Sequence, residues 1–390
     1  MDPIYYFWAA YIAVWIVISV AWWGFRARRF GVSGLPFYLL YRTTRWNSLI
    51  DRISAISPKA WRTIWNLGIA VGAGAMIFIF YELISNLVNL VFRSAQAASI
   101  QPIVPLPGVF VSYETFPYLV LALSIVVVSH ELSHGIASLG DRVPLKSAGL
   151  FFAHVLMGGF VEPDEEKLNQ AKNVTKLRIF AAGSSTNILL GICFIVLLSN
   201  FPATVAPFYN VVAAGVQIGS VPDNLPAYSS GLKAGDTVIS INGTSVSGIA
   251  DLMSVMSKVS PGQVIVVGTN TGSFTVKTGV DQNNSTHALI GISGLTDLIV
   301  YDPKLPFLSS AFPNILLHSE YWLSVVLVSV ALINMLPMYP FDGDKFIETA
   351  LNLLGLRRTN VIRSAFNIAA YALLFLNVGL SLFRFGFLRY

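Results

Sequence analysis

The third long apolar run of the chain reads FPYLVLALSIVVVSHELSHGIASL, from Phe116 to Leu139. A helix rises about 1.5 Å per residue, so this run is long enough to cross the roughly 30 Å hydrocarbon core of a bilayer. Near its end stand three ionisable side chains, His130, Glu131 and His134. Because such groups are costly to place inside a membrane, they usually have a function there. The stretch therefore predicts a membrane-spanning helix that carries a functional site.

The H-E-L-S-H pattern in this run has the spacing of a metal site. Residues four apart lie on one face of a helix, so His130 and His134 can hold one metal ion. Glu131 is not needed as a ligand and is placed to accept a proton from metal-bound water. Two alternatives stay open, a buried polar cluster that packs two helices and a proton relay in a transporter. A transporter would be expected to carry polar residues in several spans, often near the midplane.

The overall composition indicates a membrane protein. Apolar residues make up 54% of the 390, and charged residues only 12%, which is about half the charged share of soluble domains. The single cysteine, Cys193, excludes an intrachain disulfide and a cysteine-based zinc site. The net charge of +5 comes from basic residues in short loops, so we expect no nucleic-acid binding.

Six apolar runs are long enough to span a bilayer, and the loops between them predict the orientation. Eight basic residues and one acid lie between the first two runs, which places that loop in the cytoplasm. The amino terminus and segment 201–307 then fall outside, and the H-E-L-S-H end of its helix falls near the cytoplasmic side. The first run lacks a cleavage site and is interpreted as a retained helix. The expected spans are approximately Ile4–Phe25, Trp65–Phe92, Phe116–Leu139, Leu177–Leu198, Trp322–Met338 and Val361–Phe383. The basic residues of the first loop are Arg26, Arg28, Arg29, Arg42, Arg45, Arg52, Lys59 and Arg62.

Segment 201–307 is polar and reads as a separate α+β domain. Thr237–Ile241 and Gln263–Thr269 alternate as strands do, Asn242-Gly243 predicts a hairpin turn, and Asp251–Lys258 has helical spacing. The chain thus divides into two amino-terminal spans with a basic linker (1–115), the motif helix with the next span (116–200), the outer domain (201–307) and the carboxyl-terminal spans (308–390).

A catalytic zinc wants a third protein ligand and an open position, and Asp342 is the candidate. It follows the fifth span in the stretch NMLPMYPFDG, where two prolines and a glycine must end the helix. The predicted topology brings Asp342 and the H-E-L-S-H motif to the same membrane face. Asp344 and Glu348 are rivals that we expect in the headgroup region. His154 is a further possible ligand, although a loop histidine there is more often solvated.

At these residues the chain resembles the site-2 protease family of intramembrane zinc metalloproteases. The resemblance rests on the H-E-L-S-H-G stretch, on Asn334-x-x-Pro337 followed by Asp342-Gly343, and on two elements between them. It implies one Zn²⁺ per chain, held by His130, His134 and Asp342, with Glu131 as the catalytic residue. The implied reaction is hydrolysis within transmembrane segments of membrane-anchored substrates that have been cleaved on the outer side, which releases a cytosolic fragment. The two elements are LRIFAAGSSTN (Leu177–Asn187), similar to the family's Gly-x-x-x-Asn element, and Gly158-Gly159-Phe160-Val161, similar to its membrane-associated β-hairpin. Phe341 departs from the leucine of many members.

Substrate-binding residues are expected around this centre. A substrate helix must unwind before its peptide bonds are accessible, and the hairpin of residues 148–162, with Gly158, Gly159 and Phe160, can offer a strand edge to the unwound segment. Asn187 and Asn334 can donate amide hydrogens to the substrate backbone or to the developing oxyanion. The alternatives are a reentrant loop that only excludes water, and an Asn187 that only bonds to a neighbouring helix.

The outer domain looks like a PDZ module, on the stretch YSSGLKAGDTVISING (Tyr228–Gly243). PDZ domains bind carboxyl-terminal peptides at a sheet edge, and residues 214–218 are our candidate for the loop that holds the peptide carboxylate. A filter without a ligand is the alternative. A catalytically inactive PDZ-bearing scaffold is the competing function, against which the intact Glu131 and ligand set argue. The absence of a cysteine-rich luminal insert favours a prokaryotic cell membrane.

Overall fold

The computed structural model describes residues 3–24, 31–35, 37–280 and 285–388. Arg26, Arg28 and Arg29 of the predicted basic linker lie outside these ranges. The chain forms two compact units, one of Met1–Ser199 with Leu316–Tyr390 and one of Asn200–Ile315. They are called the membrane unit and the inserted unit below.

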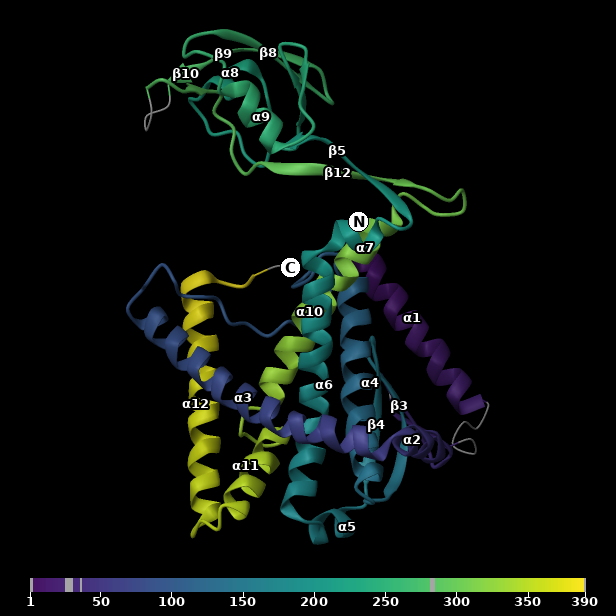
Figure 1. The fold of residues 1–390 in the computed structure, drawn as a ribbon. Coiled ribbons are helices and arrows are strands. Elements are labelled where there is room, and N and C mark those ends of the chain that lie inside the picture. Colours follow the sequence, from purple (N-terminus) through teal and green to yellow (C-terminus); the bar gives the residue numbers. More distant parts are fainter. Residues whose placement is uncertain (1–2, 25–30, 36, 281–284, 389–390) are drawn as a thin grey trace. The chain divides into compact units, whose positions relative to one another are not determined.

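The membrane unit confirms the predicted class of a polytopic helical protein (Figure 1). Among the described residues, six helices are long and apolar enough to cross a membrane. The fifth differs from its prediction, because it begins at Phe312 rather than near Trp322 and ends at Asn334 rather than Met338. The first turns of α10 contain polar residues such as Glu320. A prediction based on uninterrupted apolar runs therefore starts the helix too late. The six helices are α1 (Pro3–Gly24), α3 (Pro58–Val91), α4 (Phe116–Gly140), α6 (Asn173–Ser199), α10 (Phe312–Asn334) and α12 (Thr359–Phe385).

Small residues let α3 and α6 pack closely, and α3 crosses α6 obliquely in Figure 1. A Cβ atom added to Gly68 would lie 2.8 Å from Ser185 Oγ, and one added to Gly72 would lie 3.2 Å from Ala181 Cβ. Within a bilayer, helices associate mainly through such close backbone contact. This packing holds α6 firmly beside the motif helix α4.

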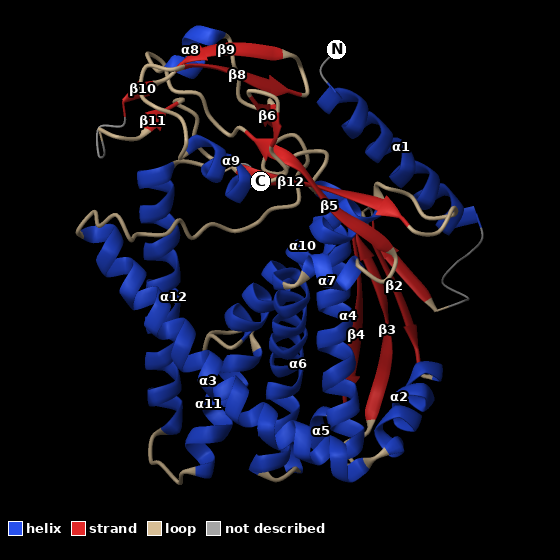
Figure 2. Cartoon of the chain, turned by 45° about the horizontal axis from the view of Figure 1, so that its top comes forward, coloured by secondary structure: helices blue, strands red, loops and turns tan. Residues whose placement is uncertain are grey.

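A four-stranded antiparallel sheet lies beside α4, in the order β1-β2-β3-β4 (Figure 2). The predicted hairpin is confirmed as β3 (Leu145–Ala153) and β4 (Leu156–Pro163). The other two strands were not predicted, because they lie in the linker that reads as a basic loop: β1 is Val32–Leu35 and β2 is Tyr38–Thr43. Since β2 covers one side of the hairpin, β4 is left as the sheet edge that faces α4.

His154 lies in the turn between β3 and β4 and is exposed, as expected of a loop histidine, although it also has partners in the chain. Its Nδ1 atom is 2.9 Å from the Tyr11 hydroxyl, and its ring stacks on Phe37 with centroids 5.8 Å apart. The Trp15 indole N–H donates to its backbone carbonyl at 3.0 Å. Aromatic side chains of α1 thus bind the hairpin tip, which removes His154 from the candidate metal ligands.

Three shorter helices complete the membrane unit. α2 (Arg45–Ile56) follows β2, and α5 (Glu165–Gln170) follows β4. The Asp164 carboxylate caps α5 by accepting a hydrogen bond from the Lys167 backbone N–H at 3.1 Å. After α10, seven residues lead to α11 (Asp342–Leu353), so Asp342 begins a new helix.

The inserted unit contains a sheet in the order β12-β5-β6-β8-β9, with β7 paired to β6. The predicted elements are confirmed in β6, β8 and α9. Asn242 and Gly243 form the expected turn between β6 and β7, with φ of 48° and 79°, as a two-residue hairpin turn requires. The elements are α7 (Phe201–Val205), β5 (Tyr209–Gln217), α8 (Pro226–Ser230), β6 (Thr237–Ile241), β7 (Thr244–Ser245), α9 (Ile249–Met256), β8 (Val264–Thr269), β9 (Ser273–Lys277), β10 (Gly279–Val280), β11 (Ala288–Leu289) and β12 (Thr296–Pro303).

The candidate carboxylate loop at 214–218 is wrong. Residues 214–217 belong to β5, which pairs with both β12 and β6. Gly215 marks a close approach of two strands. A Cβ atom there would lie 2.7 Å from the Val238 carbonyl oxygen, and glycine inside a strand often has this role.

Candidate metal centre

Three side chains converge inside the membrane unit. His130 and His134 lie on the buried face of α4, and Asp342 lies in the first turn of α11. The two Nε2 atoms are 3.0 Å apart, and the Asp342 Oδ2 atom is 3.0 Å from His130 Nε2 and 3.1 Å from His134 Nε2. In the described part of the chain, this is the one group of three or more such side chains that can hold a metal ion.

The donor set fits a zinc ion. Two imidazole nitrogens and one carboxylate oxygen are the ligand types of catalytic zinc sites, which leave a fourth position open. The His134 Nδ1 atom lies 2.6 Å from the Ile179 carbonyl oxygen. That carbonyl can only accept, so it holds the proton on Nδ1 and leaves the Nε2 lone pair free for a metal. Three acceptor atoms lie about 3 Å from one another, and a bound cation would offset the electrostatic cost of this arrangement.

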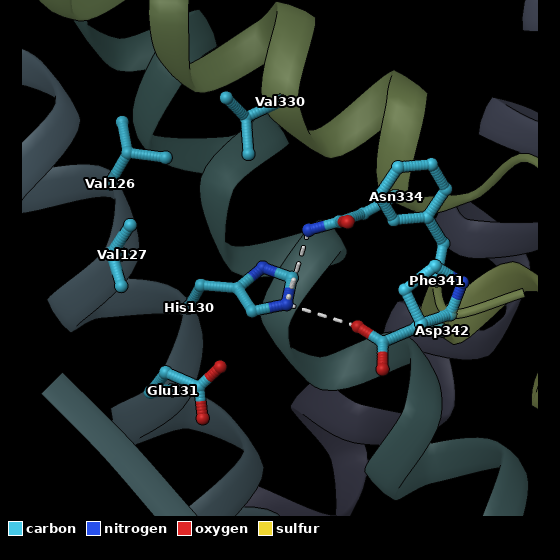
Figure 3. Close-up of a pocket in the computed structure, with 9 residues that line it drawn as sticks. Val126, Val127, His130, Glu131, Val330, Asn334, Phe341 and Asp342 are labelled. Carbon is cyan, nitrogen blue, oxygen red and sulfur yellow. Dashed lines mark hydrogen bonds and ion pairs between the residues drawn. The ribbon is translucent and has the colours of Figure 1, made fainter. Parts of the chain in front are cut away.

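Glu131 faces the same cavity without joining the ligand group. The cavity has a volume of about 200 Å³, and its lining includes His130, Glu131, Asn334 and Asp342. Figure 3 shows the Glu131 carboxylate beside His130 and apart from the contact between His130 and Asp342. Its Oε2 atom accepts a hydrogen bond from the Val161 backbone N–H of β4 at 3.2 Å. The cavity is therefore lined by residues that can hold a metal ion and also by the Glu131 carboxylate, which lies outside that group and can exchange a proton.

The two candidate asparagines occupy different places. Asn334 lines the cavity, and its Nδ2 atom is 3.5 Å from His130 Nε2 (Figure 3). Asn187 is fully buried behind His130, where it accepts a hydrogen bond from Ser129 Oγ at 2.8 Å and has Nδ2 3.4 Å from His130 Nδ1. It does not line the cavity in this conformation.

The candidate strand residues Gly158, Gly159 and Phe160 lie on β4 and do not line the cavity either. A Cβ atom on Gly158 would lie 2.9 Å from Val127 Cγ1 of α4, so the glycine lets strand and helix approach. The residue of β4 that reaches the site is Val161, through its bond to Glu131.

The rival ligands are engaged elsewhere. Asp344 is buried, and its Oδ1 atom accepts hydrogen bonds from Arg363 Nε at 2.7 Å and Asn367 Nδ2 at 2.8 Å. The hydrogen bond from Arg363 holds the pKa of the Asp344 carboxyl below its usual range. Glu348 pairs with the same guanidinium at 2.8 Å. Both carboxylates serve to join α11 to α12.

Gly183 of α6 also belongs to the site, although the sequence indicated it only as part of the Gly-x-x-x-Asn element. A Cβ atom there would lie 2.6 Å from both His130 Nε2 and His134 Nε2. The signal was present in the Gly-x-x-x-Asn spacing, but that spacing does not reveal what the missing side chain makes room for. Glycine is needed here because the two imidazoles fill the space.

Replacing Gly183 with alanine is therefore expected to displace the histidines and reduce bound zinc well below one ion per chain, as metal analysis of purified protein can measure. Gly191→Ala is the matched control, because its Cβ atom would lie equally close, 2.6 Å, to Val328 of α10 and far along α6 from the ligands. Zinc content that falls equally in both variants would point to general misfolding.

Comparisons with known proteins agree with these features. Residues 118–379 match the family model "Peptidase family M50". A membrane-bound transcription factor site-2 protease homolog from Arabidopsis thaliana is 23% identical over 210 residues, which cover 54% of this chain and 40% of the plant protein. An uncharacterized protein from Methanocaldococcus jannaschii is 24% identical over 78% of this chain and 75% of its own. A solved PDZ domain of an SdrC-like protein from Listeria monocytogenes is 24% identical, covering 22% of this chain and 93% of that domain, with a TM-score of 0.20.

The family model spans about two thirds of the chain and includes α4, α6, α10, α11 and most of α12. It therefore contains every residue of the metal-binding group and of the cavity beside it. The chain belongs to peptidase family M50, the family of the site-2 proteases.

Proposed function

We propose that the protein is a zinc-dependent intramembrane protease that hydrolyses peptide bonds within transmembrane segments of membrane-anchored proteins. The observation that carries the proposal is one cavity lined by two members of the metal-binding group, His130 and Asp342, and by the unligated carboxylate of Glu131. Most of its lining residues lie on α4 and α10, two of the helices that are long enough to span a bilayer.

The residues divide the chemistry among them. A zinc ion held by His130, His134 and Asp342 would act as a Lewis acid on the scissile carbonyl and lower the pKa of water towards neutrality. Glu131 takes a proton at its carboxylate and returns it to the leaving amine. The Asn334 Nδ2 atom lies 3.5 Å from His130 Nε2. Asn334 is therefore placed to donate a hydrogen bond to the substrate carbonyl oxygen. The apolar part of the lining is formed by Val126, Val127, Val330, Pro340 and Phe341.

The edge of β4 is the proposed docking strand for unwound substrate. An edge strand offers free backbone groups to an extended peptide, and here the Val161 N–H is directed to Glu131. A peptide that pairs with β4 would take over this N–H. It would then lie beside the carboxylate that must exchange a proton during cleavage.

The loop charges support a site near the cytoplasmic face and a cytosolic product. The His130 and His134 side chains lie in the last three turns of α4, before segment 141–176, which contains five lysine and arginine residues; the positive-inside rule counts these basic residues. Release of a cytosolic fragment corresponds to regulated intramembrane proteolysis. The inserted unit, which the same charges place outside, is proposed to select substrates pre-cleaved on that side, either by binding their new carboxyl termini as a PDZ domain does or by excluding larger ones.

Cleavage by the purified full chain tests the proposal. Reconstituted in liposomes with a single-span substrate that lacks its outer domain, the protein is expected to produce a fragment cut within the span. Removal of metal with 1,10-phenanthroline should abolish cleavage, and added Zn²⁺ should restore it, because the ion would supply the Lewis acid that activates water for attack. Mass spectrometry of the fragment locates the cut. Failure to cut any of a panel of single-span substrates, by protein shown to contain zinc, would favour the scaffold function.

A further inference from the structure

Helix α12 carries three side chains that all bind the segment around Asp342. Arg363, Asn367 and Tyr371 are spaced by four residues, so they form one stripe along the helix. Arg363 and Asn367 bind Asp344, and Asn367 and Tyr371 bind the backbone of Tyr339. These three side chains thus bind the chain on both sides of Asp342, the proposed third metal ligand.

Asn367 is the member that bridges the two sides. Its Oδ1 atom accepts a hydrogen bond from the Tyr339 backbone N–H at 3.1 Å, three residues before Asp342. Its Nδ2 atom donates to Asp344 Oδ1 at 2.8 Å, two residues after Asp342. The Tyr371 hydroxyl donates to the Tyr339 carbonyl oxygen. One amide therefore sets the spacing between the two flanks of Asp342.

In the ranges that the structure describes, Tyr339 is the one non-proline residue of segment 335–341 whose backbone N–H has no backbone partner. Between the end of α10 and the start of α11 the segment contains Pro337 and Pro340, which have no N–H to donate. Among the described residues, the hydrogen bonds to the Tyr339 backbone come from α12 alone. Within the described part of the chain, the Asp342 carboxylate is hydrogen-bonded to the two histidines alone, so its position depends on the backbone that carries it.

We propose that Asn367 is a positioning residue for the metal centre, which holds Asp342 at the distance from His130 and His134 that a metal ion requires. The inference rests on the proposed role of Asp342 as a ligand, and it does not depend on the peptidase activity. Residues that support a ligand from behind usually change metal affinity about 10- to 100-fold when they are replaced.

Metal binding by purified full-length variants tests this role. Asn367→Ala is expected to weaken zinc affinity about 10- to 100-fold, measured by competition with a chelator. It should also change the visible absorption spectrum of the Co²⁺-substituted protein, which reports ligand geometry. Tyr371→Phe removes only the hydroxyl at Tyr339 and should shift both readouts in the same direction by less. It provides the test if Asn367→Ala folds poorly.

Asn377→Ala is the matched control on the same helix. Asn377 is fully buried and bridges α12 to α3, where it donates to the Leu83 carbonyl oxygen at 2.9 Å and accepts from Asn86 at 2.9 Å. Its loss should lower thermal stability and leave zinc affinity and the cobalt spectrum unchanged. Wild-type metal binding in both Asn367→Ala and Tyr371→Phe would overturn the proposal, and so would an equal loss of zinc in Asn377→Ala. A wild-type chain that binds no zinc would remove the metal centre altogether, a result distinct from a zinc-loaded chain that does not cleave.

Discussion

Glu131→Gln is expected to abolish peptide hydrolysis and to leave the metal centre intact. Glutamine has the shape of glutamate, and its amide oxygen can still accept the Val161 N–H that Glu131 binds at 3.2 Å. It cannot take up a proton at neutral pH, and general acid–base catalysis contributes about 10²- to 10⁴-fold to such rates. Because the same carboxylate is proposed to serve in two steps, we expect a loss at the upper end of this range. Initial rates on the single-span substrate measure it.

Zinc content and a second variant complete this experiment. Glu131 lies outside the group of three ligand atoms, so the variant should retain one zinc per chain. Glu82→Gln removes an exposed carboxylate from α3 and should cleave at the wild-type rate. Full activity in Glu131→Gln would exclude Glu131 from the mechanism, and lost zinc would place it among the ligands.

Asp342→Asn is expected to lower bound zinc and, with it, activity. Asp342 supplies the one negative charge in a group otherwise made of two imidazoles, and zinc prefers a carboxylate oxygen to an amide oxygen. Asparagine keeps the volume of the side chain, so the histidines and the start of α11 should be undisturbed. Metal analysis of the purified variant, after dialysis against buffer without zinc, measures the effect.

The control for this variant is a second buried carboxylate. Glu320 in α10 is 3% exposed and lies several turns before the end of its helix, so Glu320→Gln should keep its zinc. Unchanged zinc in Asp342→Asn would show that the third ligand is another group.

The six spans and the core of the site follow from local rules that a sequence displays directly. Apolar runs, the four-residue spacing of His130 and His134, and the prolines before Asp342 each act within a few residues of the chain. They predicted both the helices and the three groups that the structure brings together. The start of α10 escaped because Glu320 interrupts the apolar run, although its side chain is buried.

The features that were missed depend on neighbours far away in the chain. Strand β2 pairs with β3, and β1 pairs in turn with β2, and a basic linker read by itself shows no such partner. Gly183 is needed because two imidazoles from another helix fill its place. Asn367 lies in an apolar span, and its role becomes visible only when the segment around Asp342 is placed against it. The contacts of His154 were not predicted for the same reason, since its partners Tyr11 and Phe37 come from two other segments.

The pairing of β2 with β3 constrains the order of events during biosynthesis. Tyr38 pairs with Ala153 and Thr43 with Ala148, while two spanning helices, α3 and α4, are made between them. The emerging β1–β2 hairpin must therefore wait, unpaired on one edge, until both helices have been inserted and the ribosome has delivered β3 and β4. During that interval a two-stranded hairpin is only marginally stable. The sheet edge beside Glu131 can thus take its final form only after the helix that carries His130 and His134 has been synthesised.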